Sequence, residues 1–325
     1  MKPVIGCLGA GRMGRGIAVV FAFAGHHVVV VDFKEREPRA FDALAAEAGT
    51  EIRATLDILS RIGLLPPELV PTIADRITIV PKHEAAAALP RCDVVFEGLP
   101  EILKLKQAAL AEASRLAGPG PIIASTTSTI LVDDLADSIE HSGRFLNAHW
   151  LNPAYLVPLI ELSPGRLTSP ETTARMKALL EGIGKVSVVC AARPGFIVPR
   201  IQTLAMNEAA RMVEEGVASA EDIDKAVIYG FGFRFAVLGL LEFIDWGGGD
   251  ILHHASRYLV EALGDSRYAA PPIIASNMRE GRIGMKTGQG FMNYDGVDQV
   301  AYRELRLAAF ASALRAMGLA REPVA

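Results

Sequence analysis

The sequence predicts an α/β fold, with a doubly wound sheet in the N-terminal part of the chain and an all-helical C-terminal part. Up to residue 190, short apolar runs alternate with amphipathic helical runs, and a glycine-rich turn follows the first apolar run. After residue 190 the alternation stops and helical spacing takes over. We therefore expect two domains, covering residues 1–191 and 192–325.

Seven apolar runs have the length and composition of buried strands. Their nearly continuous apolar character is typical of a parallel sheet covered by helices on both faces. Amphipathic segments between them, such as residues 101–118, supply those helices. The strand-like runs are residues 4–9, 27–32, 76–80, 93–98, 121–125, 144–150 and 185–190.

Capping residues mark the ends of two predicted helices. Ser169 can cap a helix over residues 170–183, Pro170 suits its first position, and Gly184 can end it. In the C-terminal part, Ser219 to Asp222 in "SAEDID" resembles a capping box that opens another helix. These signals support the change from an alternating to a helical pattern.

Composition narrows the functional classes. The 325-residue chain has a formal net charge of -4 and no block of like charge, so we expect neither nucleic acid nor membrane as its partner. Its three cysteines are far apart and have no metal-ligand spacing, so we expect them to be reduced, in the cytoplasm, and we expect no metal site. No signal peptide is visible, and the most apolar stretch is short for a membrane span.

The glycine-rich turn "GAGRMG" follows an apolar strand and opens an apolar helix. Gly9 permits the tight turn, Gly11 lets the backbone approach a pyrophosphate, and Gly14 lets helix and strand pack closely. Asp32 ends the next strand, where a carboxylate binds the adenosine ribose hydroxyls and favours NAD over NADP. Lys34 and Arg36 follow it and slightly weaken that preference. The turn predicts a Rossmann-type NAD site, in which we include Arg12 and Met13 inside the motif.

Residues 147–165, "NAHWLNPAYLVPLIELSPG", are largely apolar but contain His149, Asn152 and Glu161. Polar groups in apolar surroundings cost free energy unless they are paired. Either His149 and Glu161 form a satisfied polar pair in the core, or they form a catalytic base and its partner carboxylate. The cofactor turn upstream favours the catalytic interpretation.

Five motifs occur in an order that resembles the L-3-hydroxyacyl-CoA dehydrogenase family: "GAGRMGRGIA", "STTST", "HWLNPAYLVPLIEL", "PGFIV" and "REGRIGMKTGQGFMNYDG". The resemblance runs over essentially the whole chain. The second and third motifs are similar to the branch that contains L-gulonate 3-dehydrogenase and lambda-crystallin. The last motif is more similar to bacterial 3-hydroxybutyryl-CoA dehydrogenases.

The resemblance implies roles for six residues beyond the glycine turn. His149 matches the catalytic base, and Glu161 matches its paired carboxylate, which would fix the imidazole tautomer. Ser128 and Asn152 match residues that hold the substrate oxygen. Glu101 and Lys106 match residues on the nicotinamide side of the cofactor site.

Two departures from the family pattern leave the substrate open. The asparagine that usually follows "PGFIV" is Pro199 here, which has neither a side-chain amide nor a backbone N–H. Either proline is accommodated in the first turn of a helix, or the substrate or the way it is held differs. The helical region at residues 40–65 holds no lysine, and only Arg53 and Arg61 could meet coenzyme A there.

The sequence thus predicts an NAD-dependent dehydrogenase of a small molecule, with L-3-hydroxyacyl-CoA as the first candidate substrate and a role in fatty acid metabolism. A free 3-hydroxy acid, such as a sugar acid, is the second candidate, and a catalytically idle NAD-binding protein is the third. The helical domain is expected to serve substrate binding and homodimer formation. Glu242 and Asp245 could border a substrate mouth or serve structure, and His253 and His254 point in different directions on a helix.

Overall fold

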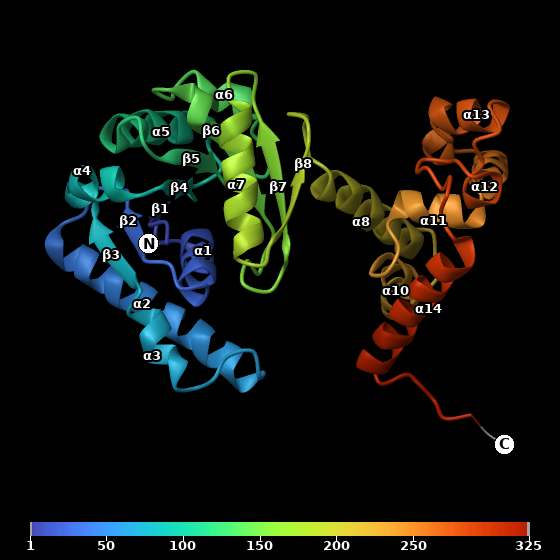
Figure 1. The fold of residues 1–325 in the computed structure, drawn as a ribbon, viewed down its shortest axis with the longest axis horizontal. Helices are drawn as coiled ribbons and strands as arrows, with labels where there is room; N and C mark the ends of the chain where they lie inside the picture. Colours follow the sequence, from blue (N-terminus) through green and yellow to red (C-terminus); the bar gives the residue numbers. More distant parts are fainter. Residues whose placement is uncertain (1, 324–325) are drawn as a thin grey trace. The chain divides into compact units, whose positions relative to one another are not determined.

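A computed structural model describes residues 2–323 of the chain. Two compact units, Met1–Ala205 and Met206–Ala325, make up the protein, and the division falls inside helix α8 (Val198–Glu214). The domain boundary expected after residue 191 lies before this division, ahead of α8. The first unit holds the sheet, and the described part of the second is built from helices (Figure 1).

The first unit is organised around an eight-stranded sheet with the order β3-β2-β1-β4-β5-β6-β7-β8. The order reverses direction between β1 and β4, which is the place where doubly wound folds bind their ligands. All neighbouring pairs are parallel except β6 and β7. The strands are β1 Ile5–Leu8, β2 Val28–Asp32, β3 Ile77–Pro81, β4 Val94–Glu97, β5 Ile122–Ser125, β6 Phe145–Trp150, β7 Leu159–Pro164 and β8 Val186–Val189.

Strand β7 departs from the fully parallel sheet that the sequence predicts. The expected strand-like runs match the other seven strands, whereas β7 lies in the segment that follows His149. Residues 151–158 connect β6 to β7 without a crossover helix. Neighbouring strands joined by so short a connection pair antiparallel, because a parallel pair needs a long crossover. The sheet is therefore mixed.

Helices cover both faces of this sheet, as the sequence predicts (Figure 1). One buried cluster joins the sheet to α1, α2, α3 and α7, and a second joins its other face to α4, α5 and α6. The expected cap of α7 is confirmed: Ser169 Oγ accepts from the Thr172 N–H at 3.1 Å. The helices are α1 Arg12–Phe23, α2 Pro38–Arg61, α3 Leu69–Ala74, α4 Ala85–Ala88, α5 Leu103–Ala117, α6 Val132–Ala136 and α7 Pro170–Gly182, with short 3-10 turns η1 Lys82–Glu84, η2 Leu89–Arg91 and η3 Ser142–Arg144.

The second unit confirms the helical prediction. Ser219 caps α9 by accepting from the Asp222 N–H at 3.1 Å, so the predicted capping motif opens a helix. A π-helical segment, η4, follows α9 directly. The elements are α9 Ala220–Ala226, η4 Val227–Gly232, α10 Phe233–Phe235, α11 Leu240–Gly247, α12 Gly249–Leu263, η5 Ser266–Tyr268, α13 Pro272–Arg279, η6 Met285–Thr287 and α14 Gln299–Ala316.

The glycine-rich C-terminal motif folds around a buried carboxylate. Asp245, 2% exposed, accepts from the backbone N–H groups of Phe291 and Met292 at 2.9 and 2.7 Å. Gly290 packs so closely that a Cβ there would lie 2.0 Å from Asp245 Oδ1. Glu242 bonds Arg306 at 2.7 Å and also the Tyr302 hydroxyl. Both carboxylates therefore bind C-terminal segments to α11. This favours a structural role for Glu242 and Asp245 over a place at a substrate mouth.

Helices of the second unit leave many large apolar side chains exposed. On α14 no residue is buried, and Val300 and Leu305 are 69% and 65% exposed. Exposed apolar surface on this scale marks an interaction site more often than a finished monomer surface. In residues 2–323 no helix is by itself long and apolar enough to cross a bilayer, although the bent pair Ala220–Phe235 and Leu240–Gly247 meets that criterion of length and composition.

Candidate active site

The glycine turn lies between β1 and α1 at the carboxyl edge of the sheet. Gly9 has φ = 97°, a conformation that other residues rarely adopt. A Cβ on Gly14 would lie 2.0 Å from the Gly9 carbonyl oxygen, so only glycine allows the helix to pack this close. A Cβ on Gly11 would meet no atom within 4 Å, which leaves open space above the turn. This open backbone surface fits a pyrophosphate.

The residues around the turn also fit a dinucleotide. Gly11 precedes α1 without a side-chain cap, so the first N–H groups of the helix are available to phosphate. Arg12 is exposed at the start of α1, where a cation suits the same anion. Met13 packs against the core below the turn. Asp32 ends β2, with Arg36 Nε donating to its Oδ2 at 2.5 Å.

His149 and Glu161 face each other across the antiparallel pair β6 and β7. They are direct register partners, so their side chains project on the same face of the sheet. His149 Nδ1 lies 2.8 Å from Glu161 Oε2, and both residues are buried. His149 and Glu161 are twelve residues apart in the sequence because the end of β6, the connecting loop and the start of β7 lie between them.

Glu161 uses its second oxygen to accept from the start of α8. Oε1 accepts the backbone N–H groups of Ile197 and Val198, each at 2.8 Å. Burial on its own raises the pKa of the Glu161 carboxyl, but the bonds from His149, Val198 and Ile197 outweigh it and hold the pKa below its ordinary value. The carboxylate is therefore ionised while buried, and it can orient and stabilise the imidazole.

Phe196 is a site residue that the sequence reasoning did not single out. Its ring stacks on the His149 imidazole, with centroids 5.2 Å apart and planes 8° from parallel. Its backbone has φ = 43°, in the left-handed region that non-glycine residues occupy at an energetic cost. The position inside "PGFIV" was visible in the sequence, but an apolar residue in an apolar segment carries no sign of this contact.

Glu101 anchors the loop that carries Ser128. Its Oε1 accepts from the backbone N–H groups of Ser128 and Thr129, each at 3.0 Å, and from the hydroxyls of Thr127 and Thr129. Burial would raise the pKa of Glu101, but the Thr127 and Thr129 bonds outweigh it and lower the pKa to about 2. The structure thus places Glu101 beneath the "STTST" loop, where it fixes the backbone around Ser128.

Lys106 lies in a buried polar network next to that loop. Its side chain is 1% exposed, and Nζ donates to Glu97 Oε1 at 2.8 Å and to the Leu99 carbonyl at 3.0 Å. Ser125, which ends β5, donates to Glu97 Oε2 at 2.6 Å. Lys106 also lies 3.4 Å from Glu101 Oε2. Glu97, which the sequence reasoning did not select, therefore links the ends of β4 and β5.

Ser128 and Asn152 lie near the same sheet edge but form no bond with the histidine pair. Ser128 is exposed three residues after the end of β5, the parallel neighbour of the strand that carries His149. Asn152 is exposed in the loop after β6 and precedes a cis peptide bond to Pro153. Their contact with substrate stays a prediction. Pro199 is the second residue of α8, so it does occupy a first helical turn.

Comparison with protein families divides the chain just before α8, about ten residues ahead of the boundary between the two units. Residues 4–193 match the model described as 3-hydroxyacyl-CoA dehydrogenase, NAD binding domain. Residues 195–294 match the model described as 3-hydroxyacyl-CoA dehydrogenase, C-terminal domain. Together the two matches cover most of the chain and include the glycine turn, the histidine pair and the Asp245 segment.

Individual relatives are similar over nearly their whole length. A 3-hydroxybutyryl-CoA dehydrogenase of Bradyrhizobium diazoefficiens is 33% identical over 92% of this chain and 98% of its own. A 5-formyl-3-hydroxy-2-methylpyridine 4-carboxylate 5-dehydrogenase of Mesorhizobium japonicum is 31% identical over 89% of this chain and 90% of its own. The solved 3-hydroxyacyl-CoA dehydrogenase of Archaeoglobus fulgidus aligns with a TM-score of 0.77 and 31% identity, over 98% of this chain and all of its own.

Proposed function

This chain belongs to the 3-hydroxyacyl-CoA dehydrogenase family of NAD-dependent oxidoreductases, and we propose that it oxidises an L-3-hydroxyacyl-CoA resembling 3-hydroxybutyryl-CoA. The observation that carries the proposal is the buried His149–Glu161 pair, on the same sheet as the glycine turn. A polar pair that served only the core would need no cofactor site on the same sheet, whereas a base for hydride transfer needs a cofactor within reach.

In the proposed reaction His149 acts as general base. Nδ1 is held by Glu161, and within residues 2–323 no protein group bonds Nε2, which is the nitrogen left for substrate. Nε2 takes the proton of the substrate hydroxyl, the carbon–hydrogen bond at C3 breaks, and a carbonyl forms. Bound NAD supplies the acceptor for that hydride. Glu161 stays ionised and stabilises the imidazolium that results.

Ser128 and Asn152 are proposed to hold the substrate oxygen as it changes from alcohol to carbonyl. Glu101 supports this role indirectly, because it fixes the backbone on both sides of Ser128. Phe196 restricts rotation of the imidazole, so that Nε2 keeps one direction. These are positioning effects, and such preorganisation is a large part of enzymatic rate enhancement.

A free hydroxy acid remains the second candidate substrate. Pro199 removes the amide expected near the substrate carbonyl, and the Mesorhizobium relative is named for a pyridine carboxylate without coenzyme A. A surface hollow of about 520 Å³ on α2 is lined by Arg53 together with Asp57 and Asp75, which makes its charge unfavourable to the phosphates of coenzyme A. The family and the 3-hydroxybutyryl-CoA relatives favour the thioester.

One assay separates the candidates. NADH formation is followed with L-3-hydroxybutyryl-CoA and, in parallel, with free L-3-hydroxybutyrate and a sugar acid such as L-gulonate. We expect turnover with the thioester and at least about tenfold lower kcat/KM without coenzyme A. Turnover only with the free acids would replace the leading substrate, and NADH binding without any turnover would favour an idle NAD-binding protein.

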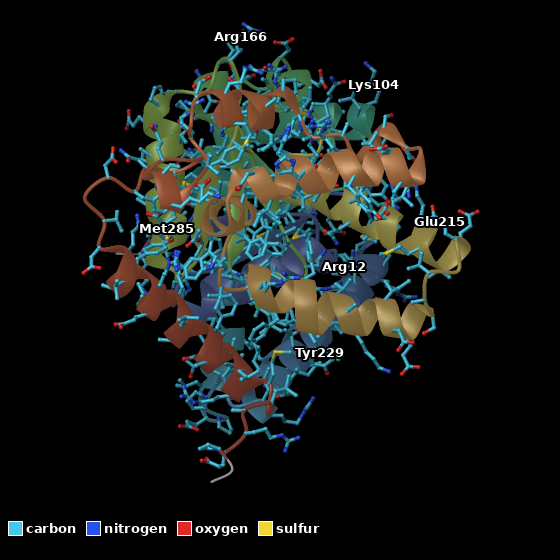
Figure 2. The ribbon with its side chains drawn as sticks, turned by 90° about the vertical axis from the view of Figure 1, so that its right-hand side faces the viewer. Arg12, Lys104, Arg166, Glu215, Tyr229 and Met285 are labelled. Atoms are coloured by element: carbon cyan, nitrogen blue, oxygen red, sulfur yellow. The ribbon has the colours of Figure 1, made fainter. Side chains whose placement is uncertain are left out.

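We also propose that the protein is a homodimer. The support is the exposed apolar surface of the helical unit, which includes Tyr229 on η4, 55% exposed (Figure 2), and Tyr258 on α12, 70% exposed. Aromatic and aliphatic side chains of this kind are enriched in permanent interfaces between identical chains. A second copy of the same chain can cover this surface without any other protein being required.

A cytoplasmic location is part of the same proposal. Burial raises the pKa of the Cys92 thiol to about 11, and it raises the pKa of Cys7 as well. Both thiols are free and buried, as expected for a reducing compartment, where unpaired cysteines persist. Fractionation of the cells that make the protein tests this directly.

A further inference from the structure

The ribose end of the cofactor site contains a cation as well as the expected carboxylate. Arg36 Nε donates to Asp32 Oδ2 at 2.5 Å, four residues after the end of β2. The Asp32 side chain is 7% exposed and the Arg36 side chain 28% exposed, so the pair lies at the surface end of a buried strand. Among residues 2–323, no other group bonds either side chain.

This arrangement leaves polar atoms of both Asp32 and Arg36 available to a ligand. Asp32 keeps Oδ1 free to accept from a ribose hydroxyl, while Arg36 keeps both terminal Nη groups free to donate. An unpaired carboxylate at this position repels a 2′-phosphate, but here its charge is balanced by the guanidinium. A guanidinium fork also matches the geometry of phosphate oxygens and binds them bidentately.

We propose that Arg36 forms a 2′-phosphate subsite, so that the protein binds the adenosine end of NADP as well as that of NAD. NAD is held through Asp32 Oδ1, and the 2′-phosphate of NADP is held through the Nη groups of Arg36. The inference rests on the proposed role of Asp32 at the ribose. It goes beyond that role by making Arg36, and not Asp32 alone, the residue that sets coenzyme selectivity.

The test is the binding of two fragments without nicotinamide, ADP-ribose and 2′-phospho-ADP-ribose, measured by titration calorimetry on the full chain. Three variants are compared with the wild type: Arg36→Gln, Arg36→Lys and Arg39→Gln. Arg39 is an exposed arginine on α2 without a bond to Asp32, so Arg39→Gln controls for a loss of general positive charge. Circular dichroism confirms that each variant folds.

In Arg36→Gln, we expect the dissociation constant of 2′-phospho-ADP-ribose to rise about tenfold or more relative to that of ADP-ribose, because the variant loses a charge-assisted hydrogen bond to the phosphate. Arg36→Lys should keep part of the affinity, and Arg39→Gln should change the ratio less than about twofold. An unchanged ratio in Arg36→Gln, or an equal change in Arg39→Gln, overturns the inference and leaves the NAD site intact. A wild type that binds ADP-ribose but not 2′-phospho-ADP-ribose also overturns the inference, and a wild type that binds neither overturns the proposed role of Asp32 as well.

Discussion

The His149 imidazole is held by contacts from two other segments of the chain, and one of these segments also fixes its partner carboxylate. Glu161 on β7 bonds Nδ1, Phe196 stacks on the ring, and the start of α8 fixes the other oxygen of Glu161. A base held in this way, as we propose for His149, presents one nitrogen in one direction before substrate arrives. Because small displacements of a catalytic group can cost about 100-fold in rate, each of these contacts has a testable effect.

Replacing Phe196 by alanine should lower kcat roughly 10- to 100-fold, because the imidazole gains rotational freedom. KM should change much less, since the contact that is lost is with the imidazole. Phe196→Tyr keeps the stacked ring and should retain most of the rate. Steady-state kinetics over a range of pH would count against the positioning role if Phe196→Ala changed KM alone or matched the wild type.

Glu101 gives the N-terminal unit a dependence on pH. Its folded pKa of about 2 lies below the ordinary value of 4.5, so its contribution to stability is present above pH 4.5 and is lost as pH falls toward 2. Glu101→Gln should therefore flatten the acid limb of the stability curve. Urea unfolding at several pH values measures this. The exposed Glu47→Gln on α2 serves as control, and equal acid limbs for Glu101→Gln and the wild type would contradict the assignment.

Individual site residues differ in how visible they are in the sequence. His149 and Glu161 stand out because ionisable side chains are rare in an apolar segment. Phe196 does not stand out, because its stacking depends on a left-handed backbone that no residue pattern announces. The place of Glu101 beside the nicotinamide stays a prediction, whereas its anchoring of the loop could not be foreseen, because only the fold brings residues 101 and 128 together.

At the scale of elements, the antiparallel pair β6 and β7 brings the two residues of the proposed catalytic pair together. The sequence predicts strand β6 but not β7, because a strand that returns directly is hard to separate from the loop before it. Once β7 pairs antiparallel, the register sets His149 opposite Glu161. A shift by one residue would turn one of the two side chains to the other face of the sheet.

The segment around Asp245 explains the glycines of the C-terminal motif by packing. Gly290→Ala places a methyl group against the Asp245 carboxylate and should destabilise the helical unit by roughly 1–3 kcal/mol, as overpacking does. Gly230→Ala on η4 is the matched control, because a Cβ there meets no atom within 4 Å. Thermal unfolding compares them. Equal melting temperatures would show that the close contact is not a constraint.

At the scale of the whole molecule, fold and family follow from the sequence more readily than assembly does. Strands and the glycine turn can be predicted from residues that are close together in the sequence. The structure contains the seven predicted strands and the turn. The apolar surface of the helical unit depends on which side chains remain uncovered after folding. Periodicity predicts helices in that unit, but it does not predict that α14 buries no residue.

The proposed homodimer has a direct physical test. Sedimentation equilibrium should give twice the 34.7 kDa mass of one chain at micromolar concentration. A paired charge substitution on the exposed apolar surface, Ile228→Glu with Tyr229→Glu, should weaken association if η4 lies in the interface. A monomer mass for the wild type would contradict the proposal, and the exposed apolar surface would then need another partner.

The central claim is that His149 is the base for hydride transfer to NAD. Its most direct test is the single-turnover rate of NADH formation from L-3-hydroxybutyryl-CoA in His149→Ala and in His149→Gln, together with the affinity of each variant for NADH. We predict a loss of about 10²–10⁴ in rate with NADH affinity within about threefold of the wild type. A rate near that of the wild type, with NADH still bound, would contradict the claim.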